Sequence, residues 1–197
     1  MNEELQWIHW WHYAASRAGT DWLPTDLQRL SAPHLNALAQ ARHAVLARRL
    51  GVAPCQPCRP EPTLLALLCV PGTLALACEL VAITCSPLSE SCGLSAEERS
   101  WCERTAKALR PGQWLEPRQD SLALLRAWLD APTWQRVRLS FARTRIEAVE
   151  RSPAPQAAAN RLDTLWRSAC WKAGRSLAHT APECLSTEVN DACTTLA

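Results

Sequence analysis

The longest apolar stretch of the chain runs from Thr63 to Cys85 and contains one charged residue, Glu79. It is nearly as long as a membrane-spanning helix, which needs about 20 apolar residues. However, Pro71 and Gly72 interrupt it, and a carboxylate inside lipid costs about 2.5–3.5 kcal/mol on insertion scales. Neither flank carries the cluster of positive charges that would orient a membrane helix. We therefore expect a buried apolar helical hairpin over 63–85, broken at Pro71 and Gly72.

The segment 32–50 carries helix boundary signals at both of its ends. Ser31 is a suitable N-cap, and Pro33 has the fixed backbone angle that suits a first helical turn. Gly51 can adopt the left-handed conformation that often follows the last helical residue. One continuous helix is therefore predicted between Ser31 and Gly51.

A second clear start signal is the capping box formed by Ser95 and Glu98, which predicts a helix from 96 to about 109. The segment 53–62 contains four prolines and is expected to be a loop. Apolar periodicity and turn residues predict helices in five more segments: 3–17, 24–30, 118–130, 133–150 and 156–178.

Residues 136–142 alternate between polar and apolar side chains, as a half-buried strand does. No second convincing strand is available to pair with them, and a lone strand would leave its backbone groups without partners. A helical conformation is therefore expected there too. The sequence predicts an all-α fold of about seven or eight helices, with a single compact helical domain over 1–180 and a weakly structured tail over 181–197.

The aromatic residues are unusual, because ten are Trp while Tyr and Phe occur once each. Trp buries a large area in protein cores and is also enriched at the energetic centres of interfaces. Most of the ten are expected in the core, and Trp7, Trp10 and Trp11 are candidates for a partner surface. The net charge of +2 is too small to indicate nucleic acid as the main partner.

The chain also contains ten cysteines, which could form disulfides in an exported protein. The N-terminal segment instead has acidic residues where an export signal carries positive ones. We therefore expect a cytoplasmic protein with reduced thiols. Cys55 and Cys58 form a C-x-x-C pair, yet prolines follow where redox chemistry needs a helix N-terminus, and no second ligand pair completes a zinc site.

No other chemical motif indicates an enzyme. His9 and His12 lie one helical turn apart and could share a metal, although an aromatic helix of this kind more often packs on its neighbours. The sequence lacks a nucleophile elbow, a zinc-protease motif and a glycine-rich phosphate loop. We assign no catalytic residue, metal or cofactor, and expect a non-enzymatic protein.

Two groups of arginines are candidates for partner surfaces. Arg42 and Arg49 are seven residues apart, so on one helix they would share a face and could bind an acidic partner. Their stems could equally lie along the edge of the core while the guanidinium groups reach water. The seven arginines within 117–151 are expected on a solvated helix face, with an ion pair between Arg143 and Glu147.

The apolar centre of the chain has the features of a known family. The run Leu64-Leu65-Ala66-Leu67-Leu68-Cys69, followed by Gly72 and then Ser86-Pro87-Leu88, resembles the K component of the type III secretion sorting platform, the SctK/YscK family. A second similarity lies at Leu125-Arg126-Ala127-Trp128-Leu129, followed by Trp134 to Leu139. Together these parts cover roughly 60–145.

The resemblance implies a small, mainly helical adaptor at the cytoplasmic face of the inner membrane, within the injectisome. Such proteins join the cytoplasmic domain of the inner-ring D component to the Q component of the pods, and they have no catalytic residues to carry over. They reach the membrane through protein contacts and bind no nucleic acid. The alternative from another class is a cytoplasmic helical metal- or thiol-redox protein that uses Cys55 and Cys58.

Overall fold

The computed structural model describes residues 2–58, 61–86, 93–117 and 119–180, and within these ranges it contains helices and connections but no strand. The predicted all-α fold is confirmed, with ten α-helices in the described ranges against the seven or eight expected. The expected tail over 181–197 lies outside the described residues. The α-helices are α1 (Glu3–His12), α2 (Ala32–Ala41), α3 (His43–Arg49), α4 (Pro62–Cys69), α5 (Thr73–Cys85), α6 (Ala96–Leu109), α7 (Ser121–Trp128), α8 (Ala131–Val137), α9 (Arg143–Arg151) and α10 (Ala159–Thr180).

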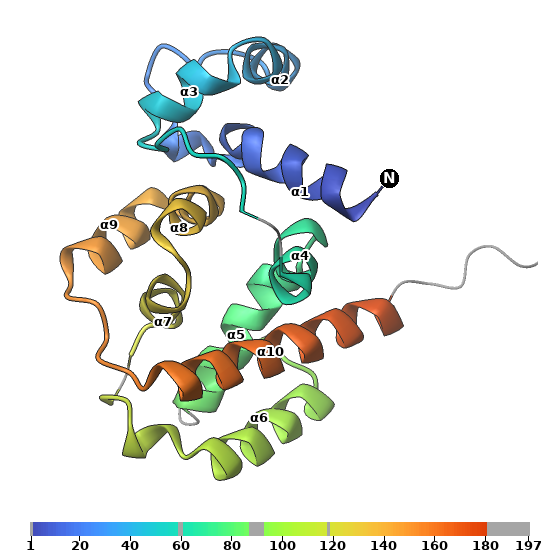
Figure 1. The fold of residues 1–197 in the computed structure, drawn as a ribbon, viewed down its shortest axis with the longest axis vertical. Helices are drawn as coiled ribbons and strands as arrows, with labels where there is room; N and C mark the ends of the chain where they lie inside the picture. Colours follow the sequence, from blue (N-terminus) through green and yellow to red (C-terminus); the bar gives the residue numbers. More distant parts are fainter. Residues whose placement is uncertain (1, 59–60, 87–92, 118, 181–197) are drawn as a thin grey trace, which may run out of the picture.

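Helix α5 is the centre of the fold. It packs against α4, α6, α7 and α10, and α10 crosses it while α6 runs along the lower edge of the view in Figure 1. Ala77, Leu80 and Val81 of α5 are completely buried. The long helix α10 contributes the matching apolar face, with these buried residues: Leu162, Leu165, Trp166, Ala169, Cys170 and Ala173. The burial of these apolar side chains is the main source of stability for α5 and the helices packed around it.

The apolar segment forms two helices, as predicted, with the break at Pro71 and Gly72. Gly72 has a φ of +82°, which a residue with a Cβ adopts only with strain. Helix α5 is largely buried, whereas in α4 only Leu67 is fully buried. In the described part of the chain no single helix is long and apolar enough to span a membrane. Helices α4 and α5 reach that length and composition only together, and they are bent by 107° at the break.

Helices α1, α2 and α3 form a layer at the top of Figure 1, joined to the rest through α4, α8 and two short 3-10 helices, η1 (Ala14–Arg17) and η4 (Arg138–Ser140). Trp7 and Trp10 stack with ring centroids 5.2 Å apart, and Trp11 packs beside them. The indole N–H groups of Trp7 and Trp11 donate hydrogen bonds to the carbonyls of Cys58 and Cys55, at 2.9 and 2.8 Å. The proline-rich loop is therefore fixed to α1 through its backbone.

The prediction of one helix over 32–50 is wrong, because the chain leaves the helical conformation at Arg42 (φ −133°, ψ 31°). The break lets α2 and α3 pack separately against η1. The end signal at Gly51 is confirmed: Gly51 has a φ of +71°, and the amides of Gly51 and Val52 donate to the carbonyls of Arg48 and Ala47. These two bonds form a Schellman motif.

The predicted helix over 133–150 is also divided, into α8, η4 and α9. Between η4 and α9, Phe141 is extended and Ala142 (φ −56°, ψ 129°) is not helical. Contacts from distant residues hold this break: the Trp22 indole donates to the Phe141 carbonyl at 2.8 Å, and the Gly19 amide donates to the Leu139 carbonyl at 3.2 Å. Two other helix predictions are wrong in part. The segment 24–30 forms turns and no helix, and the helix predicted over 3–17 ends at His12 and is followed by η1.

Candidate functional site

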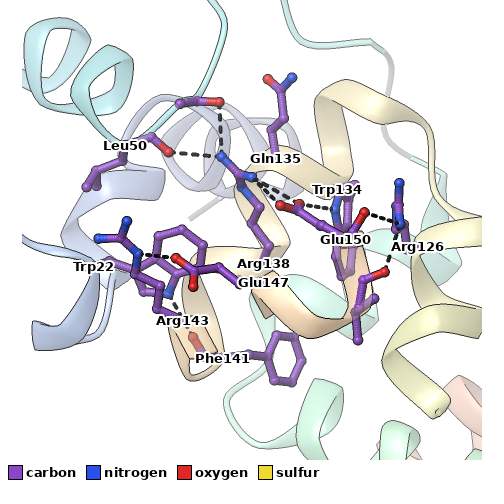
Figure 2. A network of polar contacts seen from close by, with 12 residues as sticks. Trp22, Leu50, Arg126, Trp134, Gln135, Arg138, Phe141, Arg143, Glu147 and Glu150 are labelled. Atoms are coloured by element: carbon purple, nitrogen blue, oxygen red, sulfur yellow. Dashed lines mark hydrogen bonds and ion pairs between the residues drawn. The ribbon is translucent and has the colours of Figure 1, made fainter. Parts of the chain in front are cut away.

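Arg138 connects the C-terminal end of α3 to α9, as Figure 2 shows. The guanidinium group of Arg138 donates to both carboxylate oxygens of Glu150 at 3.0 and 3.1 Å, and to the carbonyls of Leu50 and Gly51 at 3.1 and 3.2 Å. The Trp134 indole donates to the same carboxylate at 2.9 Å. The last carbonyls of a helix lack partners within the helix, so Arg138 caps α3 and pairs Glu150 at once.

Two other arginines of this region, Arg126 and Arg136, also donate to backbone carbonyls. Arg126 donates to the carbonyls of Val149 and Ser152, at the end of α9, as Figure 2 shows in part. Arg136 is only 4% exposed; it donates to the Trp11 carbonyl at 3.1 Å and lies 3.9 Å above the Trp11 ring. Burial lowers the pKa of Arg136 below its ordinary value. The expectation of a solvated arginine face is therefore wrong for these residues.

Of the seven arginines, Arg118 lies outside the described residues, and those of the described part that are exposed, Arg143, Arg145 and Arg151, lie on α9. Arg143 pairs with Glu147 at 2.8 Å, as predicted, and Arg145 pairs with Asp120 at 2.9 Å. Each of these side chains is 39–52% exposed. Exposed pairs of this kind contribute little to stability, typically about 0.2–1 kcal/mol. This surface therefore shows no sign of a built binding site.

The residues predicted to bind partners do not lie together on one surface. Trp7, Trp10 and Trp11 are buried and belong to the core, so their rings are not exposed to a partner. Arg42 and Arg49 are exposed, but the helix break at Arg42 removes the shared helical face on which that prediction depended. Arg49 lies 3.7 Å from Asp26 in an exposed ion pair.

Cys55 and Cys58 are exposed free thiols, without a disulfide, in the loop before α4. Among the described residues no group of three His, Cys, Asp or Glu side chains is placed to hold a metal ion. His9 and His12 each lie beside another ring, His9 with Tyr13 at 4.6 Å and His12 with His43 at 6.1 Å between centroids. The described residues therefore do not bring a third ligand to either pair, Cys55 with Cys58 or His9 with His12.

A groove lies between α6 and α10. It consists of two adjoining hollows of about 540 and 600 Å³ that share Trp101, Arg104 and Trp171. Trp171 is 58% exposed, whereas Trp101 is half-buried. The lining residues show that α6 and α10 run in opposite directions along the groove, since Glu97 lies near His179 at one end and Leu109 near Arg167 at the other.

The acidic groups of the groove are already engaged within the chain. Lys172 is 7% exposed and donates to Glu97 at 2.5 Å, and this contact holds the pKa of the Glu97 carboxyl below its usual range. The Glu98 carboxylate accepts bonds from the Ser95 amide and hydroxyl, both at 2.8 Å, which confirms the predicted capping box. The Glu97 carboxylate therefore holds α6 to α10 through Lys172, and the Glu98 carboxylate caps the N-terminus of α6.

The basic groups of the groove are engaged unequally. Arg167 pairs with Asp163 at 2.7 Å and with Glu61. Arg104 donates to the Ser100 hydroxyl at 2.7 Å, and Arg175 lies 5.1 Å from the centre of the Trp171 ring. Neither Arg104 nor Arg175 has an ion pair with a carboxylate within the described ranges.

Sequence reasoning missed this groove, although one signal was available. The apolar stripe of α10 contains Leu165, Trp166 and Ala169, and Trp171 falls outside it among polar residues. A large aromatic residue on the polar side of an amphipathic helix is unusual and indicates an exposed contact surface.

Comparison of the chain with protein-family models, with curated proteins and with solved structures found no match.

Proposed function

We propose that the chain is a non-enzymatic adaptor that binds another protein in the groove between α6 and α10. The observation that carries this proposal is the exposure of Trp171 next to Trp101, with Arg104 and Arg175 beside them. Trp and Arg are the residues most enriched at the energetic centres of interfaces. Helices α6 and α10 both pack on α5, so the two Trp side chains start from fixed helices and require little reordering of the backbone when a partner binds.

The finer proposal is that this adaptor is a K component of the type III secretion sorting platform. Its support is the sequence resemblance at 64–72 and 125–139 together with the all-helical fold. In that role it would lie in the cytoplasm at the inner-membrane face of the apparatus. It would connect the cytoplasmic domain of the inner-ring D component to the Q component of the pods.

Affinity capture from the source bacterium tests the adaptor role. Tagged full-length chain should co-purify a protein partner, and Trp171→Ala should reduce that capture by about tenfold or more, the typical loss at an interface centre. Leu5→Ala is a matched control, because Leu5 is 56% exposed on α1 and no residue of α1 lines the groove. Unchanged melting temperatures would show that both variants fold. Capture that is equal for Trp171→Ala and the unsubstituted chain would contradict the groove as the docking surface.

Gene deletion tests the finer proposal. Deletion should abolish type III secretion while the membrane rings still assemble, because loss of an adaptor separates the pods from their anchor. Secretion that continues after deletion would exclude the K-component assignment. It would leave the adaptor role to be judged by the capture experiment alone.

A further inference from the structure

The charges of the groove indicate what kind of partner it binds. We infer that it takes an acidic amphipathic helix of another protein, with an apolar side chain between Trp101 and Trp171 and carboxylates on Arg104 and Arg175. This inference rests on the adaptor role proposed above and adds the chemistry of the partner. The inference is based on charge: Glu97, Glu98 and Arg167 have partners within the chain, whereas Arg104 and Arg175 have no carboxylate partner among the described residues.

Arginine and tryptophan are paired on both walls. On α6, Trp101 and Arg104 are three residues apart, and on α10, Trp171 and Arg175 are four residues apart. Residues at these spacings lie on the same side of a helix, so each wall presents one aromatic ring beside one guanidinium group. All four line the same hollow. The groove thus offers an apolar centre with positive charge on both sides.

The charge left over in the groove is positive. Glu97 is neutralised by Lys172, and Glu98 is held in the capping box of α6. Arg167 is neutralised by its own acidic partners. In the described residues Arg104 and Arg175 therefore remain as two cations without a carboxylate. A carboxylate brought by a partner would meet no repulsion from an unpaired acid in the groove, which favours acidic partners and disfavours basic ones.

The length of the groove matches that of a short helix. The lining of α6 extends from Glu97 to Leu109, which corresponds to roughly 18 Å at the helical rise. A partner helix of roughly 12 residues matches this length. Binding of an amphipathic helix in a groove uses apolar anchors at helical spacing, and the two Trp rings supply the surface for such anchors.

A nucleic acid would be the other anionic ligand for this surface, and the charge count argues against it. Two free arginines would neutralise only two phosphates, which gives a weak electrostatic term. One face of the exposed Trp171 ring is also occupied by Arg175 from the same chain, at 5.1 Å. The acidic helix uses the same cations and also buries apolar area against Trp101.

Peptide binding to the full chain tests the inference. The probe is a fluorescently labelled 14-residue amphipathic peptide with leucines on one face and glutamates beside them, and the control peptide has lysines in place of the glutamates. Fluorescence anisotropy should show binding of the glutamate peptide alone. Trp171→Ala should weaken it by about tenfold or more. The double variant Arg104→Gln with Arg175→Gln should weaken it by at least about threefold and flatten its salt dependence.

A charge-matched control uses arginines away from the groove. Arg42→Gln with Arg49→Gln removes the same charge from the other end of the molecule and should leave peptide affinity unchanged. Equal weakening by both double variants would overturn the inference, because it would show attraction to net charge only. Preferential binding of the lysine peptide, or of a single-stranded oligonucleotide through Trp171, would overturn it too.

The two proposals fail separately. If Trp171→Ala loses the captured partner but the chain does not bind the glutamate peptide, the adaptor role stands and the acidic-helix chemistry is wrong. If Trp171→Ala changes neither capture nor peptide binding, the groove is not the docking surface and both proposals fall. Sedimentation of the chain alone, with unchanged mass in the Trp171→Ala variant, would exclude a second copy as the occupant.

Discussion

At the scale of single residues, Arg138 stabilises the fold by satisfying groups from two other parts of the chain, Glu150 and the carbonyls of Leu50 and Gly51. Its guanidinium group pairs Glu150 and caps the end of α3, and its side chain is only 15% exposed. Loss of this side chain would leave the carboxylate and two carbonyls with fewer partners in a partly buried position. An unpaired polar group in such a position costs more than the pair itself contributes.

We therefore predict that Arg138→Met lowers the free energy of unfolding by roughly 3 kcal/mol. The matched control is Arg143→Met, since Arg143 forms an exposed pair with Glu147 and should cost less than about 0.5 kcal/mol. Urea unfolding followed by circular dichroism measures both values. Equal effects of the two substitutions would show that the carbonyl and carboxylate contacts of Arg138 do not stabilise the fold.

The cysteines should differ sharply in reactivity. Cys55 and Cys58 are exposed, whereas Cys78 and Cys170 are buried, and burial raises the pKa of each of these two thiols to about 12. Only the thiolate reacts with alkylating agents, so the buried thiols should stay unmodified at pH 8. Brief iodoacetamide treatment of the native protein, followed by peptide mass spectrometry, should find label on Cys55 and Cys58. Labelling of Cys78 before unfolding would contradict the packing of α5.

At the scale of helices, the capping box of α6 should make stability depend on pH. Burial raises the pKa of Glu98, but hydrogen bonds from Ser95 and Ser176 outweigh it, so the pKa is lowered overall. A carboxyl with a lower pKa in the folded state stabilises the fold above its unfolded pKa of about 4.3. This contribution is lost as the pH falls through the folded pKa.

The variant Glu98→Gln should therefore be less stable than the unsubstituted chain by about 1 kcal/mol at pH 7, with a smaller difference at pH 3. Urea midpoints at pH 7, 5 and 3 measure the change. The control is Glu103→Gln on the exposed side of the same helix, which should change stability by less than about 0.5 kcal/mol at each pH. A Glu98→Gln difference that is the same at all three values would exclude an ionised capping box.

Helix ends were predictable where the signal is local. The capping box at Ser95 and the Schellman glycine at Gly51 depend on residues within six positions, and both are confirmed. The breaks at Arg42 and Phe141 were not predictable in this way. The Phe141 carbonyl is held by Trp22, 119 residues earlier, so its partner is known only once the chain has folded.

The groove shows the same limit at the level of the site. Each wall is an ordinary amphipathic helix in the sequence, and only the antiparallel placement of α6 and α10 on α5 brings Trp101 and Trp171 together. The residues predicted to bind partners are separated for a related reason. Trp content correctly indicated a large core, but no local pattern showed that Trp11 lies beneath the guanidinium group of Arg136.

At the scale of the whole molecule, α4 connects the layer of α1, α2 and α3 to the helices around α5. It contacts α1 on one side and α5 and α10 on the other, and its Leu67 is completely buried. Buried hydrophobic residues from Trp7 to Ala173 form one continuous cluster through this connection. A shared core of this kind favours unfolding of all its elements in one cooperative step.

Leu67→Ala should therefore destabilise this layer and the helices around α5 together, by about 2–5 kcal/mol, the usual cost of deleting a buried leucine side chain. Trp fluorescence reports on the cluster of α1 as well as on α10, and circular dichroism reports on all helices, so both urea curves should coincide and shift equally. Leu5→Ala on the exposed side of α1 is the control and should shift neither curve by more than about 0.5 kcal/mol. Two separate transitions, with only one moved by Leu67→Ala, would show that α1 to α3 fold as a unit of their own. In that case α4 would be a linker between two units, and the prediction of a single domain over 1–180 would be wrong.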